Sequence, residues 1–141
     1  MKVVVALFSV LVLFVITSTN VNAFRGKPPA IDSVSIKGFE PTRDEVLVIK
    51  SRLPYFISES PEGRRGLLRD LSEYKYQFKI LVDDTENRYV FINAVCKSYL
   101  GEIKSWDTEL VLVKDGGNCF FSLEFEPRSG SFRNFFIHGE A

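Results

Sequence analysis

The chain has 141 residues, 45% of them hydrophobic, and its 18 basic and 18 acidic side chains leave no net formal charge. This composition is typical of a globular protein, and the length allows one domain. The balanced charge offers no electrostatic attraction for nucleic acid. One histidine and two cysteines exclude a zinc site built on several histidines or on four cysteines. We therefore expect no nucleic-acid partner and no metal or other cofactor.

Residues 1–23 are typical of a secretory signal peptide. A short positive start precedes the apolar stretch 3–16, and Val21-Asn22-Ala23 fits the small-residue cleavage pattern before Phe24. The apolar stretch is too short to cross a bilayer core of about 30 Å as a helix. We expect a secreted or periplasmic protein without a membrane span after signal cleavage, with a retained N-terminal anchor as the alternative.

The next segment, 24–40, is expected to be a mobile N-terminal segment because it contains Gly and paired Pro. A short strand is expected within it, over 31–36. A single α+β domain is expected over 41–141.

Two helices are expected at the start of this domain. Thr42 and Glu45 form a capping-box pattern, so a helix should begin there and end at Pro54. A second helix should begin at Ser60, with Pro61 in its first position. Its expected buried stripe is Leu67, Leu68 and Leu71.

The apolar period then changes to two, which indicates strands. The expected strands are 74–82, 88–97, 107–114, 118–126 and 131–138. The helix or two helices would pack on this antiparallel meander sheet of four to five strands, an α+β fold. The arrangement is similar to the cystatin-like and nuclear-transport-factor-like two-layer folds, an analogy about fold alone.

Turn positions predict the register of the last strands. A tight turn at Asp115-Gly116 would place Leu112 opposite Cys119. A turn centred on Arg128-Ser129 would form the pairs Phe125–Phe132, Phe121–Phe136 and Cys119–His138.

The opposite face of this sheet would carry many large apolar side chains: Tyr89, Phe91, Val111, Val113, Phe120, Phe135 and Ile137. So many exposed apolar residues exceed normal scatter. Either the second helix, the N-terminal segment or sheet curvature covers them, or they form a dimer interface or a surface for a ligand or partner.

A disulfide between Cys96 and Cys119 is expected in an oxidising compartment and would stabilise the fold by about 3 kcal/mol. In a plain meander a strand separates the two, with Cα atoms about 10 Å apart, beyond bridging range. Either the segment 98–106 crosses over and allows the bond, or the thiols stay apart; the compartment favours the bond.

The sequence gives weaker support for a catalytic or ion-binding site than for a contact surface. Cys119 opposite His138 would be a thiol–imidazole pair, and a small thiol enzyme is therefore an alternative. A serine hydrolase is disfavoured because the chain has no Gly-x-Ser-x-Gly turn. Solvated surfaces explain the carboxylates Asp83, Asp84 and Glu86 and the basic residues Arg64, Arg65 and Arg69.

The last third of the chain resembles a group of short exported bacterial proteins of uncharacterised function. The resemblance is carried by Asn93-Ala94-Val95-Cys96, Trp106, Asp115-Gly116-Gly117 and the closing His138-Gly139-Glu140-Ala141. The group has Phe where this chain has Val95, and Asn where it has His138. The resemblance implies export and a shared C-terminal sheet, and it implies no catalytic residue.

These observations favour an exported, non-enzymatic domain that contacts a protein or an apolar ligand through an aromatic sheet face. Possible partners are another protein or a second copy of this chain. A structural envelope protein is a further alternative. The expected contact residues are Tyr89, Phe91, Phe120, Phe135 and Ile137.

Overall fold

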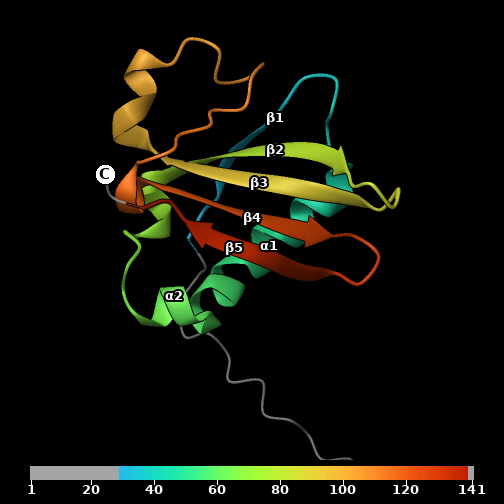
Figure 1. Cartoon of the computed structure of the whole chain (residues 1–141), viewed down its shortest axis with the longest axis horizontal. Coiled ribbons are helices and arrows are strands. Elements are labelled where there is room, and N and C mark those ends of the chain that lie inside the picture. The colour runs from blue at the N-terminus through green and yellow to red at the C-terminus, as the bar shows by residue number, and fades with distance from the viewer. Residues whose placement is uncertain (1–28, 140–141) are drawn as a thin grey trace, which may run out of the picture.

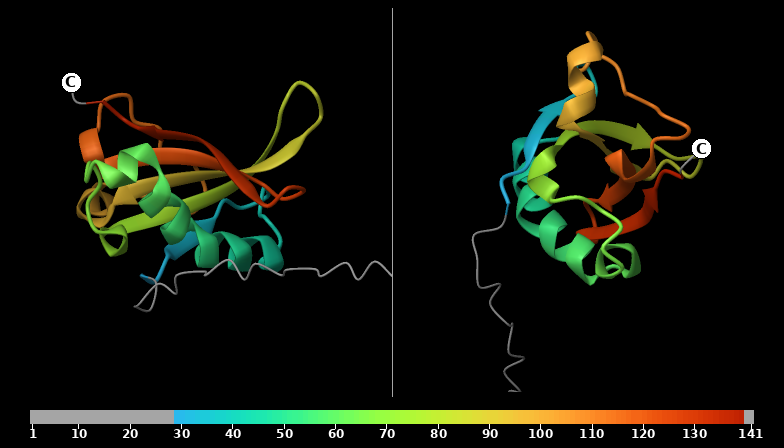
Figure 2. Two further views of the ribbon diagram at one scale, coloured as in Figure 1. Left: turned by 90° about the horizontal axis from the view of Figure 1, so that it is seen from below. Right: turned by 90° about the vertical axis from the view of Figure 1, so that its left-hand side faces the viewer.

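The computed structural model describes residues 29–139, which form one five-stranded sheet with a long helix against one face (Figures 1 and 2). The elements are, in chain order, β1 (Asp32–Ser35), α1 (Arg43–Glu59), α2 (Pro61–Arg64), η1 (Leu71–Glu73), β2 (Tyr74–Val82), β3 (Arg88–Cys96), η2 (Lys97–Glu102), η3 (Gly117–Cys119), β4 (Phe120–Glu126) and β5 (Ser131–Ile137). In the sheet the strands follow the order β1-β2-β3-β4-β5. β1 runs parallel to β2 and every other neighbouring pair is antiparallel, so the expected α+β fold with a strand meander is confirmed.

The expected signal peptide and residues 24–28 of the expected N-terminal segment lie outside the described residues. β1 lies within 24–40 and confirms the short strand expected there: it pairs with β2, and Ile31 and Ile36 at its ends are buried. No helix within residues 29–139 is both long enough and apolar enough to cross a membrane.

α1 begins as its sequence predicts. The Thr42 hydroxyl accepts a hydrogen bond from the backbone N–H of Glu45 at 3.3 Å, and the Glu45 carboxylate accepts one from the backbone N–H of Thr42 at 2.8 Å. The expectation that Pro54 ends the helix is wrong, since α1 continues to Glu59. Proline removes one backbone hydrogen bond, but Leu53 and Ile57 beside it are buried and hold both sides of the helix against the sheet.

The main core lies between α1 and one face of the sheet. The strand residues buried on this face are Tyr74, Tyr76, Phe78, Val90, Ile92, Ala94, Phe121, Leu123 and Phe125. Tyr74 meets Phe121 edge to face, with ring centroids 4.9 Å apart. Such geometry is favourable between aromatic rings beyond the area that they bury.

The second helix is much shorter than expected. Ser60 caps it by accepting a hydrogen bond from the backbone N–H of Gly63, but α2 ends at Arg64 and buries no residue. Gly66, at a φ of +66°, turns the chain away from the helix. The expected buried stripe therefore does not form: Leu67 is exposed, and Leu68 and Leu71 pack against the core from the connection to β2.

The strand expected over 107–114 is wrong, because this segment has no regular secondary structure. β3 pairs directly with β4, with Val95 opposite Phe120, and residues 97–119 leave the sheet as a long connection between them. The turn expected at Asp115-Gly116, with Leu112 opposite Cys119, is therefore absent as well. We call residues 97–119 the β3–β4 connection; it is the orange segment above the sheet in Figure 1.

A bulge changes the register between β4 and β5. The pair Phe125–Phe132 is confirmed, but beyond the bulge Phe121 pairs with Ile137 instead of Phe136. Asn134, at a φ of +52°, is the extra residue. Asparagine tolerates this left-handed conformation better than most residues, and an inserted residue reverses which side chains face the core beyond it.

The ion pair between Glu45 and Arg88 yields a testable pH dependence. Arg88 hydrogen-bonds both carboxylate oxygens and is the main cause of the lowered pKa of Glu45. Glutamine can still cap the helix through its amide oxygen, but Glu45→Gln removes the charge and one of the two oxygens that accept from Arg88. It should lower the free energy of unfolding at pH 7 by about 1 kcal/mol.

The stabilisation by ionised Glu45 is complete above the unfolded pKa of about 4.3 and disappears as pH falls through the lower pKa of the folded state. Denaturant unfolding should therefore show a wild-type advantage that shrinks below about pH 4. An advantage that stays constant between neutral and acidic pH would contradict this role. Glu59→Gln, at an exposed position of the same helix, is the control.

Candidate functional site

The structure divides the five expected contact residues between the two faces of the sheet. Tyr89, Phe91 and Phe120 lie on the face that points away from α1. Phe135 and Ile137 lie on the α1 face because of the bulge. The Phe135 ring lies 6.1 Å from Phe56 of α1 and 5.6 Å from Phe121 of the core. The expected continuous aromatic face therefore does not form.

The β3–β4 connection covers part of the face that points away from α1, here called the outer face. Gln77 of β2 and Asn93 of β3 stand opposite each other on it and are 0% and 2% exposed. The Gln77 amide donates to the carbonyl oxygens of Trp106 and Glu109 at 2.6 and 2.7 Å.

Gln77 also accepts from the backbone N–H of Val111 at 2.9 Å, and Asn93 donates to the Val111 carbonyl at 2.7 Å. The two amides also bond each other. They satisfy the backbone of a segment that has no strand partner, as buried polar groups require. The sequence left open whether the outer face is covered within the molecule or forms a contact surface. The face is covered in part, and the segment that covers it is the β3–β4 connection, which was not among the segments expected to do so.

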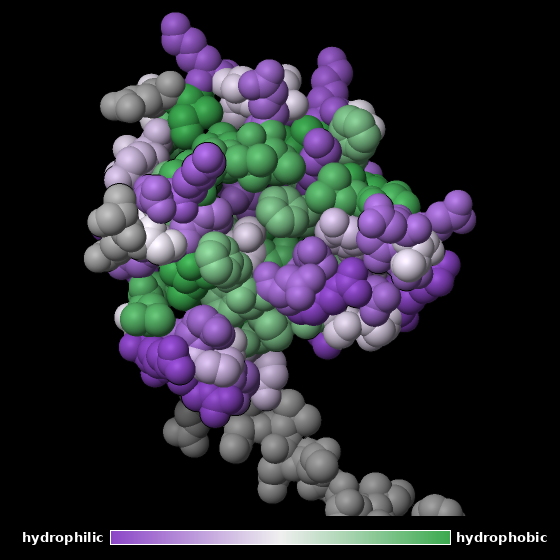
Figure 3. All heavy atoms as spheres, in the orientation of Figure 1, coloured by the Kyte–Doolittle hydropathy of each residue, from purple (hydrophilic) through white to green (hydrophobic). Residues whose placement is uncertain are grey.

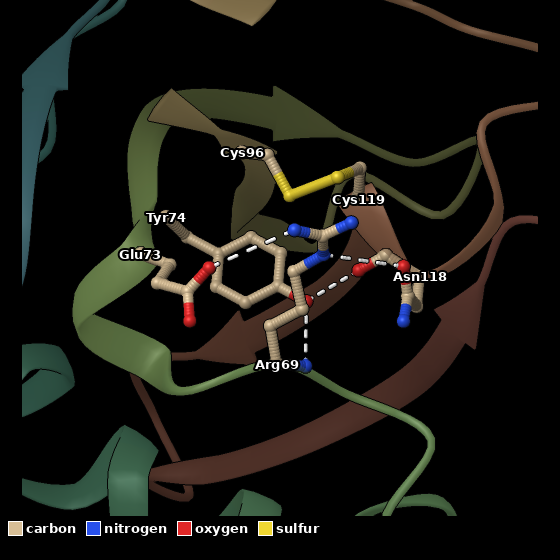
Figure 4. The surroundings of a disulfide bond; sticks show 6 residues. All are labelled: Arg69, Glu73, Tyr74, Cys96, Asn118 and Cys119. Atoms are coloured by element: carbon tan, nitrogen blue, oxygen red, sulfur yellow. Dashed lines mark hydrogen bonds and ion pairs between the residues drawn. A yellow bond between two sulfur atoms is a disulfide. The ribbon is translucent and has the colours of Figure 1, made fainter. Parts of the chain in front are cut away.

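The disulfide between Cys96 and Cys119 forms the base of this connection. The direct pairing of β3 with β4 brings the two Cα atoms to 4.9 Å, so the expected bond is confirmed and the expected intervening strand is not. Figure 4 shows its surroundings. The Tyr74 hydroxyl donates to the carbonyl of Asn118, and the Arg69 backbone N–H donates to the Tyr74 hydroxyl at 3.1 Å. Burial is the main cause of the raised pKa of Tyr74, which therefore stays a neutral donor.

Four aromatic rings gather on the outer face, near the two cysteines between which the β3–β4 connection runs. They are Tyr99, Phe120, His138 and Phe136, and we call them the aromatic strip. Their successive ring centroids are 5.2, 6.4 and 5.3 Å apart, and each neighbouring pair meets edge to face. Figure 3 views the outer face and shows apolar side chains gathered over its middle.

The backbone holds this strip in place. Tyr99 follows Cys96 by three residues and Phe120 follows Cys119 directly, so the disulfide positions both rings. The His138 N–H donates to the Phe120 carbonyl at 3.0 Å. Gly116 packs under the Phe120 ring, where an added Cβ would lie 2.0 Å from a ring carbon. Phe120 is therefore buried at 3% exposure, whereas Tyr99 and Phe136 are 50% and 59% exposed.

A cleft of about 470 Å³ adjoins the strip at His138. Its lining residues are Gly66, Leu67, Gly117, Asn118, Ile137 and His138. Its lining combines the apolar side chains of Leu67 and Ile137 with the amide of Asn118 and the imidazole of His138.

The remaining candidate chemistry gains no support from the geometry. The Cys119 sulfur is bonded to Cys96, and His138 pairs with Phe120 instead of Cys119, so the two do not form a thiol–imidazole pair. Asp83 closes the β2–β3 turn by accepting from the backbone N–H groups of Thr85 and Asn87. Within residues 29–139, no three Asp, Glu, His or Cys side chains are placed to hold a metal ion.

Comparison of the chain with protein-family models, with curated proteins and with solved structures finds no match.

The contact residues expected from the sequence did not include Tyr99, Phe136 and His138. Tyr99 lies outside the strands, and Phe136 was assigned to the core face by an unbulged register. The presence of Asn at position 134, a residue type that adopts positive φ, was the available indication of a bulge.

Proposed function

We propose that this protein is an exported, non-enzymatic binding domain that holds an apolar or aromatic group of a protein partner on the aromatic strip. The observation that carries the proposal is the pair of half-exposed rings, Tyr99 and Phe136, on a frame fixed by a disulfide. Rigid aromatic side chains lose little conformational entropy on contact and supply large contact areas.

Export is supported by two independent features. The N-terminal 23 residues have the pattern of a signal peptide, and the disulfide is the state expected of a cysteine pair outside the reducing cytosol. The proposed location is therefore secreted or periplasmic.

Peptide selection tests the proposed contact surface. A displayed random peptide library would be selected on the folded protein, and the best peptides measured by calorimetry against two variants. Phe136→Asp places a charge within the strip and should weaken binding at least tenfold. Val82→Asp is the matched control, because Val82 is 61% exposed, as Phe136 is at 59%, and lies at the opposite end of the sheet.

The control should retain the wild-type affinity. Equal losses in both variants, or peptides that bind with no contribution from position 136, would contradict the proposal. Sedimentation of the wild type and of Phe136→Asp tests whether the partner is a second copy: a dimer lost only in this variant identifies the strip as its interface.

A further inference from the structure

The connection between α2 and β2 carries a paired basic sequence. Arg64 and Arg65 are the only two adjacent basic residues in the chain. Arg64 is the last residue of α2, and residues 65–70 form no helix or strand before η1 begins at Leu71. The pair thus lies where regular structure stops.

The backbone of this pair is hydrogen-bonded within its own short turn, where the N–H groups of Arg64, Arg65 and Gly66 donate to the carbonyls of Ser60, Pro61 and Gly63. Arg64, Arg65, Gly66 and Leu67 are all exposed. The backbone N–H groups of Leu67 and Leu68 donate to no backbone carbonyl within the described part of the chain. The preceding helix has four residues, none of them buried. A short segment with few buried contacts opens locally at little free-energy cost, and exposed segments of this kind are the usual places of proteolytic nicking.

We propose that the segment 62–69 is a cleavage site for an endoprotease with acidic specificity pockets, which converts the exported chain into a two-chain protein. Arginine side chains fit such pockets, as in trypsin-like enzymes, where an aspartate at the base of the pocket binds the basic residue. Water adds across the amide between Arg65 and Gly66; the Arg65 carbonyl becomes a carboxylate and the Gly66 nitrogen becomes a free amine. This inference does not depend on the aromatic strip.

The two products are expected to stay together. β1 and α1 lie before the cut, and β2 to β5 with both cysteines lie after it. α1 buries Ile49, Leu53 and Ile57 against the sheet, and β1 remains paired with β2. The cut crosses neither contact.

The proposed cut between Arg65 and Gly66 lies at the wall of the cleft beside His138. Gly66 and Leu67 line that cleft, so cleavage places a new, positively charged N-terminus at its wall. Cleavage would therefore change the shape and charge of the hollow that adjoins the strip.

Limited proteolysis of the folded protein, recovered after expression of the full-length chain, tests the proposal. The probes are trypsin at a low ratio and a kexin-type endoprotease that requires paired basic residues. Mass spectrometry under denaturing, non-reducing conditions should show two separate fragments as the first products, divided after Arg65. A cut at Lys104 or Lys114 would instead leave both pieces joined by the disulfide, because these residues lie between the two cysteines.

Two variants make the result specific. Arg64→Gln combined with Arg65→Gln should slow the first cut at least tenfold, whereas Arg128→Gln, at an exposed arginine in the β4–β5 turn, should leave its rate unchanged. The cut protein should elute from a gel-filtration column at the position of the uncut protein. A first cut elsewhere, an unchanged rate in the double variant, or separation of the two fragments without denaturant would overturn the proposal.

Discussion

Replacing Gln77 by methionine is expected to lower the free energy of unfolding by about 3 kcal/mol. The substitution keeps the volume of the side chain but removes every hydrogen bond that its amide makes to the β3–β4 connection. The Val111 N–H and the carbonyl groups of Trp106 and Glu109 lose their partner at a position where Gln77 itself is 0% exposed. Each buried backbone group left without a partner costs about 1–3 kcal/mol, and entry of water limits the sum.

Denaturant unfolding measures this loss, and hydrogen exchange locates it. Amide protons of residues 103–113 should exchange faster in Gln77→Met, while those of β2 and β3 keep most of their protection. Lys79→Met is the matched control, since Lys79 lies on the same face of β2, and its ammonium group lies 4.7 Å from the centroid of the Phe39 ring in a cation–π interaction. It should cost less than about 1 kcal/mol. Equal losses in the two variants would show that the amide bonds do not hold the connection.

Removing the disulfide is the second large effect. The double variant Cys96→Ser, Cys119→Ser opens a loop with a sequence separation of 23 residues. The expected loss in the free energy of unfolding is about 3 kcal/mol, which lowers the melting temperature by roughly 10 °C for a domain of this size. Both sulfurs belong to buried residues, so the serine hydroxyls add a desolvation cost in the same direction.

The variant should also loosen the aromatic strip, because the bond positions Tyr99 and Phe120. Reduction of the wild type with a phosphine should reproduce the loss measured in the double variant. Melting temperatures that agree within a degree or two between the oxidised wild type and the variant would contradict a stabilising role for the bond.

The sequence correctly predicts those parts of the fold that short-range interactions along the chain determine. The capping box of Thr42 and Glu45 is present, β2 follows the alternation of apolar residues in its sequence, and β3 forms in the apolar stretch expected to be a strand. Each of these features depends on residues that are neighbours in the chain. The disulfide was expected from the cysteine count and the proposed export, although the path that allows it was open.

The expectations that proved wrong concern elements whose structure is determined by contacts between residues far apart in the sequence. Pro54 stays inside α1 because the sheet holds the helix on both sides of it. Apolar residues alternate over 107–114 as they do in a strand. The backbone of this segment nevertheless hydrogen-bonds the side chains of Gln77 and Asn93 instead of a neighbouring strand. In the sequence Gln77 is typical of a solvent-facing strand position, so its burial depends on the connection that crosses it.

Contacts between residues far apart in the sequence also explain why the candidate contact surface consists of other residues than those expected from the sequence. A single extra residue at Asn134 turned Phe135 and Ile137 toward α1 and left Phe136 on the outer face. An expectation based on strict alternation has no means to include such a residue unless the partner strand is known.

Photo-crosslinking in the exporting cell tests the binding role of the aromatic strip most directly. A benzophenone amino acid would be placed at position 136 or, as control, at position 82, which is equally exposed at the far end of the sheet. We predict a discrete covalent adduct from position 136 and none from position 82. No adduct from position 136, or the same adducts from both positions, would contradict the assignment of the strip as the contact surface.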